Sequence, residues 1–258
     1  MSKRIRAERG PRPMPLPGSS LAQQLDDHFL DKMLPPLLAA VGSVGLAGME
    51  WWRYFHPTEP SPWGITIFAA LMVGWALWSL PRRFNKARQI KLGMAGERAV
   101  GQYLEWFRSD RHFVFHDIPT ISGNIDHLLI GPKGLFTIET KTLSKPERGA
   151  CVIRFAGDNL EANGRQFDRN PIIQAKAEAG WVRNFLRDGR FKAPVWPVVI
   201  IPGWFVEPFD MRAAGVWVLE TKALKTYVLN CEDQLTYEEV KAIASAIKSY
   251  VLSRTAEK

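Results

Sequence analysis

Asp126, Glu139 and Lys141 are the residues of this chain whose types and spacing best suit chemistry on a charged group. They lie in a segment whose pattern predicts two strands joined by the turn Gly131–Gly134. In a symmetric antiparallel hairpin centred on that turn, Asp126 lies opposite Glu139. Because side chains alternate along a strand, Lys141 then projects from the same face as both carboxylates.

This set of side chains suits a divalent cation. Directly opposite residues have Cβ atoms about 4.5–5.5 Å apart, so the two carboxylates repel each other unless a cation lies between them. We expect Asp126, Glu139 and the main-chain carbonyl of Thr140 to hold Mg²⁺ or Mn²⁺, since hard cations prefer oxygen ligands. With Lys141 orienting or deprotonating a water, or donating to a phosphate, such a site would hydrolyse a phosphodiester. The alternative interpretation is an ordinary edge hairpin in which both carboxylates are exposed and Lys141 pairs with one of them.

The segments around the hairpin alternate between helical and strand patterns, and their order predicts an α/β sandwich around a mixed sheet. The expected elements are a helix over Gly93–Ser109, strands over Phe113–Ile118, Ile125–Ile130 and Leu135–Lys141, weaker strands over Cys151–Phe155 and Asn159–Ala162, a helix over Pro171–Leu186, strands over Val195–Pro202 and Gly215–Leu219, and a closing helix over Tyr237–Ser253.

Two apolar segments, residues 34–52 and 63–80, precede this domain. At about 1.5 Å per residue each helix would reach close to the ~30 Å thickness of a bilayer core, so we expect a transmembrane helical hairpin over residues 34–80. A basic, Pro-rich leader over residues 1–33 and a basic juxtamembrane linker over residues 81–92 flank it. The alternative is a soluble enzyme in which both segments are core helices.

The charge distribution agrees with that organisation. The net charge is +8, yet the residues from 92 onward carry 22 Lys/Arg and 20 Asp/Glu, so most of the excess lies beside the apolar segments. Positive flanks predict that both ends are cytoplasmic, in a multi-pass protein of the cell (inner) membrane. Two cysteines are too few for a disulfide framework or a zinc site.

Four motifs in the expected order resemble the nuclease-related domain (NERD) family, a branch of the PD-(D/E)xK nuclease-like superfamily. They are a G-x-x-G-E helix start at Gly93–Glu97, N-I-D-H at Asn124–His127, G-x-F-x-I-E-x-K at Gly134–Lys141, and N-P-x-x-Q at Asn170–Gln174. The resemblance covers residues 93–180. Residues 93–258 are therefore expected to form the nuclease-like domain with a C-terminal extension.

The resemblance implies a restriction-endonuclease-like mixed sheet flanked by helices, and a role in DNA processing with Mg²⁺ at Asp126 and Glu139. It implies further that Glu97 completes the metal shell or acts as a second acid, and that Gln174 bonds a phosphate or Lys141. Within the hairpin we expect Asn124 to hold Lys141 and His127 to lie on the opposite face. Basic residues near the site could contact a DNA backbone: Lys145, Arg148, Arg154 and Arg165.

Two functional hypotheses follow. The first is a membrane-anchored, metal-dependent nuclease acting on nucleic acid, DNA before RNA, at the cytoplasmic face. The second is a catalytically silent NERD-fold binding or scaffold module, which the net charge of only +2 from residue 92 onward favours. The sequence contains no phosphate-binding G-x-x-x-x-G-K-[ST] motif, so a targeting or unwinding activity would come from a partner protein.

Overall fold

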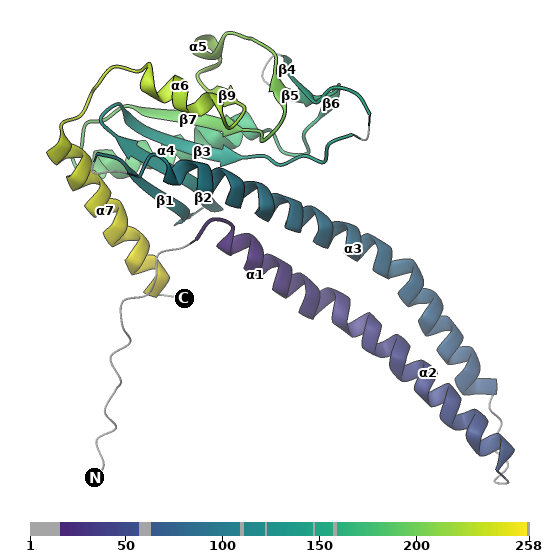
Figure 1. The fold of residues 1–258 in the computed structure, drawn as a ribbon. Helices are drawn as coiled ribbons and strands as arrows, with labels where there is room; N and C mark the ends of the chain where they lie inside the picture. The colour runs from purple at the N-terminus through teal and green to yellow at the C-terminus, as the bar shows by residue number, and fades with distance from the viewer. Residues whose placement is uncertain are drawn as a thin grey trace, which may run out of the picture. The chain divides into compact units, whose positions relative to one another are not determined.

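The computed structural model describes residues 16–56, 63–108, 111–121, 123–146, 148–156 and 159–256 (Figure 1). The chain divides into two units. One comprises residues 20–92, and the other comprises residues 93–258 together with the segment up to Ser19. The larger unit contains all the residues proposed for chemistry, and each unit is described by itself below.

A five-stranded mixed sheet is the centre of the larger unit. Its strand order is β1-β2-β3-β7-β9, formed by β1 (Phe113–Thr120), β2 (Gly123–Gly131), β3 (Gly134–Thr140), β7 (Val195–Ile200) and β9 (Trp217–Leu219). Strands β1, β2 and β3 pair antiparallel, whereas β3, β7 and β9 pair parallel. All seven residues of β3 are buried, which fits a central strand covered on both faces.

A second sheet lies beside the first. The sequence patterns predict two of its strands, over Cys151–Phe155 and Asn159–Ala162, but not that they form a separate sheet. Its order is β6-β5-β4-β8, formed by β4 (Val152–Ala156), β5 (Asn159–Ala162), β6 (Arg165–Gln166) and β8 (Phe205–Val206). Strands β6 and β8 have two residues each, too few for a periodic signal, and they exist because β5 and β4 supply their hydrogen-bond partners. The single mixed sheet of the prediction is therefore corrected to two mixed sheets flanked by helices.

Helices cover both faces of the five-stranded sheet (Figure 1). On one face α4 (Pro171–Asp188) and α7 (Tyr237–Ala256) pack on Leu128, Ile130 and Leu135. On the other face the end of α3 (Trp63–Glu105) and α6 (Ala223–Leu229) pack on residues such as Phe136 and Ile138. A one-turn helix, α5 (Met211–Ala214), leads into β9. Burial of apolar side chains on both faces stabilises the sheet, by roughly 25 cal/mol for each Å² of apolar surface removed from water.

The smaller unit is helical. It contains α1 (Ser19–His28), a π-helical turn (Phe29–Met33), α2 (Leu34–Phe55) and the first part of α3. The predicted juxtamembrane linker over residues 81–92 lies within α3, which runs unbroken through it and through Pro81. Its sequence contains good helix formers and no glycine before Gly93, so nothing ends the helix there.

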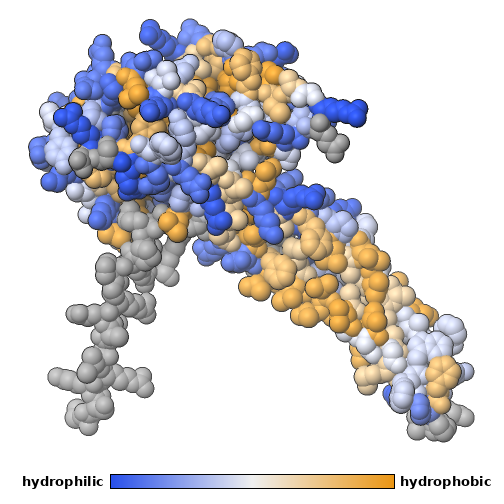
Figure 2. All heavy atoms as spheres, viewed as in Figure 1, coloured by the Kyte–Doolittle hydropathy of each residue, from blue (hydrophilic) through white to orange (hydrophobic). Residues whose placement is uncertain are grey.

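Large apolar side chains on this unit are exposed, among them Leu38, Val41, Leu71, Leu77 and Trp78. Figure 2 shows apolar residues gathered along its helices. Along the described residues, however, no helix combines the length and the hydropathy needed to cross a membrane. The predicted transmembrane spans over residues 34–52 and 63–80 are therefore not supported. The leader up to residue 15 and the loop at 57–62 lie outside the described residues.

Candidate active site

The β2–β3 hairpin has the register predicted from its turn. Leu128 pairs with Thr137 and Ile130 pairs with Leu135. Beyond the last backbone pair, His127 with Ile138, the Thr140 amide donates to Asp126 Oδ2 over 2.8 Å. This hydrogen bond fixes the Asp126 side chain against the end of β3, beside Glu139.

Lys141 joins the hairpin to α4. Its Nζ lies 2.5 Å from Glu139 Oε1 and donates to Gln174 Oε1 over 2.9 Å. Gln174 is held in the first turn of α4, where Asn170 caps the helix by accepting from the Ile172 amide. The predicted hydrogen bond between Gln174 and Lys141 is thus confirmed.

Asn124 does not hold Lys141, and that prediction was wrong. Its Nδ2 instead donates to Asp117 Oδ1 over 2.7 Å. The reason lies in β1, where Asp117 has a left-handed φ of 51° between the pairs His116–His127 and Ile118–Ile125. A non-glycine residue in this region costs about 1 kcal/mol or more, and such strain is concentrated at functional sites. Asp117 is a further carboxylate of the site, and β-strand patterning gave no signal for it.

Glu97 reaches the same cluster from α3. The helix can approach closely because residue 96 is glycine: a Cβ there would lie 1.6 Å from Thr142 Oγ1. Glu97 is 9 % exposed and accepts a hydrogen bond from the Gly18 backbone. Burial, followed by the charges of Asp117 and Glu139, raises the pKa of Glu97 to about 7.

Glu178 is a fifth carboxylate that the motifs did not include. It lies one turn after Gln174 on α4, is 8 % exposed, and is buried against the site. Burial, then the charge of Glu139 and a hydrogen bond to that carboxylate, raises the pKa of Glu178 to about 11. The i, i+4 spacing from Gln174 would have been a signal for it, because such residues share a helix face.

Asp126 has the same electrostatic character. Burial of its carboxyl group, then the charges of Glu139 and Glu97, raises its pKa well above the ordinary value, and the hydrogen bond from Thr140 opposes this shift. Among the described residues, Lys141 is the cation that counters these acids. A cluster of acids with one lysine must bind protons or further cations at neutral pH.

The donor set fits a divalent cation by its chemistry. When both acids are ionised, three buried carboxyl oxygens lack a hydrogen-bond donor among the described residues: Glu139 Oε2 and both oxygens of Glu178. The buried Thr140 Oγ1 also lacks a partner among these residues. Buried oxygens of this kind are what a hard cation binds. Within the same residues, no three Asp, Glu, His or Cys side chains are already arranged as ligands of one ion, so binding requires these side chains to converge. The role predicted for the Thr140 carbonyl stays a prediction.

His127 lies on the opposite face, as predicted. It is fully buried, and its Nδ1 is 2.9 Å from His116 Nδ1. Burial lowers the pKa of His127 to about 3, so the ring is neutral at physiological pH. The four basic residues considered for DNA contact are exposed, and Arg154 pairs with Glu207 over 2.9 Å.

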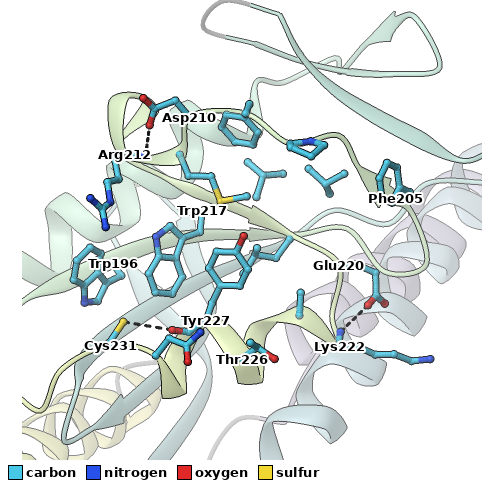
Figure 3. A pocket seen from close by; sticks show the side chains of 18 of the residues that line it. Trp196, Phe205, Asp210, Arg212, Trp217, Glu220, Lys222, Thr226, Tyr227 and Cys231 are labelled. Atoms are coloured by element: carbon cyan, nitrogen blue, oxygen red, sulfur yellow. Dashed lines mark hydrogen bonds between the residues drawn. The ribbon is translucent and has the colours of Figure 1, made fainter.

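A large pocket lies elsewhere, at the β9 edge of the sheet (Figure 3). Its volume is about 1460 Å³, and residues of β7, β9, α6 and the 203–212 loop line it. Trp196 stacks on Trp217 with ring centroids 5.3 Å apart, and Tyr227 lies against Trp217 at 5.5 Å. None of the five carboxylates lines this pocket.

Comparison with known families supports the resemblance that the motifs suggested. Residues 92–202 match the family model described as Nuclease-related domain. No curated protein and no solved structure matches the chain. The matched segment contains Glu97, Asp117, the β2–β3 hairpin, Gln174 and Glu178, and it ends just after β7. The larger unit is thus a mixed α/β unit whose segment 92–202 matches the model of the nuclease-related domain family.

Proposed function

We propose that the nuclease-related domain is a metal-dependent phosphodiester hydrolase that acts on nucleic acid, with DNA as the first substrate to test. The observation that supports this most is the pair Asp126 and Glu139 beside Lys141. Glu139 is buried with one oxygen, Oε2, that lacks a partner among the described residues, and the half-buried Asp126 accepts from the Thr140 amide. The match to the nuclease-related family supports the same class of reaction.

In this proposal Asp126 and Glu139 hold Mg²⁺ or Mn²⁺, and Glu97 completes the shell. The ion would lower the pKa of a bound water and offset negative charge on the phosphoryl oxygens. Lys141 Nζ, held by Gln174, donates to the phosphate or orients the attacking water. Gln174 therefore positions the lysine instead of contacting the reacting atoms.

A cleavage assay tests the proposal. The full chain is incubated with supercoiled plasmid and with single-stranded DNA and RNA, in Mg²⁺, in Mn²⁺ and in EDTA. We expect cleavage with either metal and none in EDTA. Asp126→Ala and Lys141→Ala should each abolish it, whereas Lys192→Ala, which changes an exposed lysine outside the cluster, should cleave like the wild type. Metal-dependent cleavage that survives in both site variants would exclude the proposed roles.

The competing function is a binding or scaffold module without catalysis. The net charge of +2 from residue 92 onward favours it, because nucleic-acid enzymes usually present a basic field. Thermal denaturation with millimolar Mg²⁺ or Mn²⁺ separates the two functions, because an ion that binds the folded state must raise Tm. No rise in Tm for the wild type, together with no cleavage, would support the scaffold.

We also propose that the helical unit attaches the chain to a lipid bilayer, with the nuclease-related domain on the cytoplasmic side of the inner membrane. The exposed apolar residues of α2 and α3 support attachment, as do the five Lys/Arg over residues 81–91, which suit anionic headgroups. Flotation of the full chain with anionic vesicles should recover it in the lipid fraction, and removal of residues 16–92 should leave it in the dense fraction. Recruitment to a specific nucleic acid would require a targeting or unwinding partner.

A further inference from the structure

Glu178 has a feature that the motif residues do not explain. Its side chain is more than nine-tenths buried. When ionised, neither of its oxygens has a hydrogen-bond donor among the described residues, and only its protonated form can donate to Glu139. It projects from the α4 face that carries Gln174, toward Glu139 and Asp126. A buried acid placed against two other acids is costly, and a purely structural role is served better by an apolar residue.

Lys141 counters Glu178 only through its charge and forms no direct ion pair with it among the described contacts. The lysine Nζ already contacts Glu139 Oε1 at 2.5 Å and Gln174 Oε1 at 2.9 Å. Glu139 keeps its other oxygen, Oε2, buried without a partner among the described residues. Three carboxyl oxygens, two from Glu178 and one from Glu139, therefore remain available beside Asp126.

We infer that Glu178 is an additional ligand of the divalent cation held by Asp126 and Glu139, so that the ion lies between the hairpin and α4. This inference rests on the proposed function and deepens it, because Glu178 lies outside the four motifs that resemble the family. A ligand from α4 also links the ion to the helix that positions Lys141 through Gln174. Metal binding then strengthens the attachment of α4 to the sheet.

The test is Mn²⁺ binding to the full chain, measured by electron paramagnetic resonance and by calorimetry at pH 7.5. Glu178→Gln keeps the shape and can still donate a hydrogen bond to Glu139, but it loses a charged ligand. We expect it to bind Mn²⁺ at least tenfold more weakly than the wild type, and Glu178→Asp to recover part of the affinity. Glu238→Gln, an exposed glutamate on α7, is the matched control and should bind like the wild type.

Metal-free stability is the second readout. Without metal, the raised pKa keeps Glu178 protonated and neutral at pH 7.5. Glu178→Gln replaces one neutral donor with another, so its Tm in EDTA should be close to that of the wild type, whereas its rise in Tm with Mn²⁺ should be smaller. If Glu178 only donates a hydrogen bond to Glu139, the glutamine replaces it and Mn²⁺ affinity stays unchanged, which overturns the inference. Should Glu178→Gln fail to fold, unchanged affinity in Glu178→Asp would overturn it equally.

The outcomes separate the inference from the proposed function. Wild-type binding that Asp126→Asn abolishes and Glu178→Gln leaves intact removes Glu178 from the ligand set, yet keeps the metal site. No Mn²⁺ binding to the wild type contradicts the proposed function itself, and the inference falls with it.

Discussion

The acidic cluster and the aromatic pocket at the β9 edge are two regions of one sheet with opposite properties. The pocket is large, but its rings pack on one another: Trp196 on Trp217, and Trp217 on Tyr227. None of the cluster's carboxylates lines that pocket. The cluster gathers five acids around one lysine and leaves buried oxygens without partners among the described residues when the acids are ionised. The difference teaches that the size of a cavity and the presence of unsatisfied buried charge are separate criteria, and the proposed function rests on the second.

The sharpest contrast between the two regions is catalytic. Glu139→Gln removes a negative ligand from the cluster, and we expect cleavage to fall about 1000-fold, or ~4 kcal/mol of transition-state stabilisation. Tyr227→Ala changes an exposed ring of the pocket and should leave the rate within about twofold. Rates of plasmid nicking under matched metal concentrations measure both. A large loss in Tyr227→Ala with a small one in Glu139→Gln would move the active site to the pocket.

The second prediction concerns how the stability of the folded chain depends on pH through Glu97 of the acidic cluster. The pKa of Glu97 is raised from 4.5 to about 7 in the folded chain, so between these values the folded state binds more protons than the unfolded state. Glu97 therefore contributes about 3 kcal/mol to the free energy of unfolding below about pH 4.5. This contribution is lost as the pH rises through 7. Urea unfolding in EDTA should show that loss in the wild type.

Glu97→Gln isolates the contribution of this residue. The glutamine cannot titrate, so the stability difference between variant and wild type should grow in favour of the variant from pH 5 to pH 7.5. Saturating Mg²⁺ should reduce that difference, because the ion stabilises the charged carboxylate. A constant difference across this pH range would show that Glu97 titrates normally and lies outside the charged cluster.

A third contrast concerns how α3 approaches the cluster. Gly96→Ala places a Cβ 1.6 Å from Thr142 Oγ1, so the helix must shift, and we expect a loss of about 2 kcal/mol from overpacking. Gly180→Ala on α4 meets nothing within 4 Å and should raise stability by about 0.5–1 kcal/mol. Urea unfolding of the two variants should give opposite signs. Equal effects would contradict the close approach of α3 to the sheet.

The smallest expected effect is at Gln174. Gln174→Ala removes one hydrogen-bond partner of Lys141 while the ion pair with Glu139 remains, so we expect a loss of about tenfold in rate, or ~1.4 kcal/mol. Its Mn²⁺ affinity should stay close to that of the wild type. A loss in affinity as large as that of Asp126→Asn would place Gln174 among the ligands instead.

The sequence predicts the parts of the site that depend on local pattern. The turn Gly131–Gly134 and strand alternation are sufficient to predict which hairpin residues pair, because register follows from turn geometry. The Asn-Pro start of α4 similarly places Gln174 in a first turn, where it meets Lys141.

The features of the fold and the site that the sequence does not predict depend on long-range packing. Asp117 joins the site through a left-handed backbone that no strand pattern encodes. Glu178 shares a helix face with Gln174, as their i, i+4 spacing indicates, but its burial against the cluster depends on how α4 lies on the sheet. Strands β6 and β8 form only on the edges that β5 and β4 offer. Each of these features is determined by residues far away in the sequence.

The most direct test is a calorimetric titration of the full chain with Mn²⁺, repeated on Asp126→Asn. If the buried acids form a metal site, the wild type binds one or more ions per chain, and the asparagine variant loses at least tenfold in affinity. Equal binding by the two proteins, or no binding by either, would contradict the assignment of these carboxylates to a metal-dependent active site.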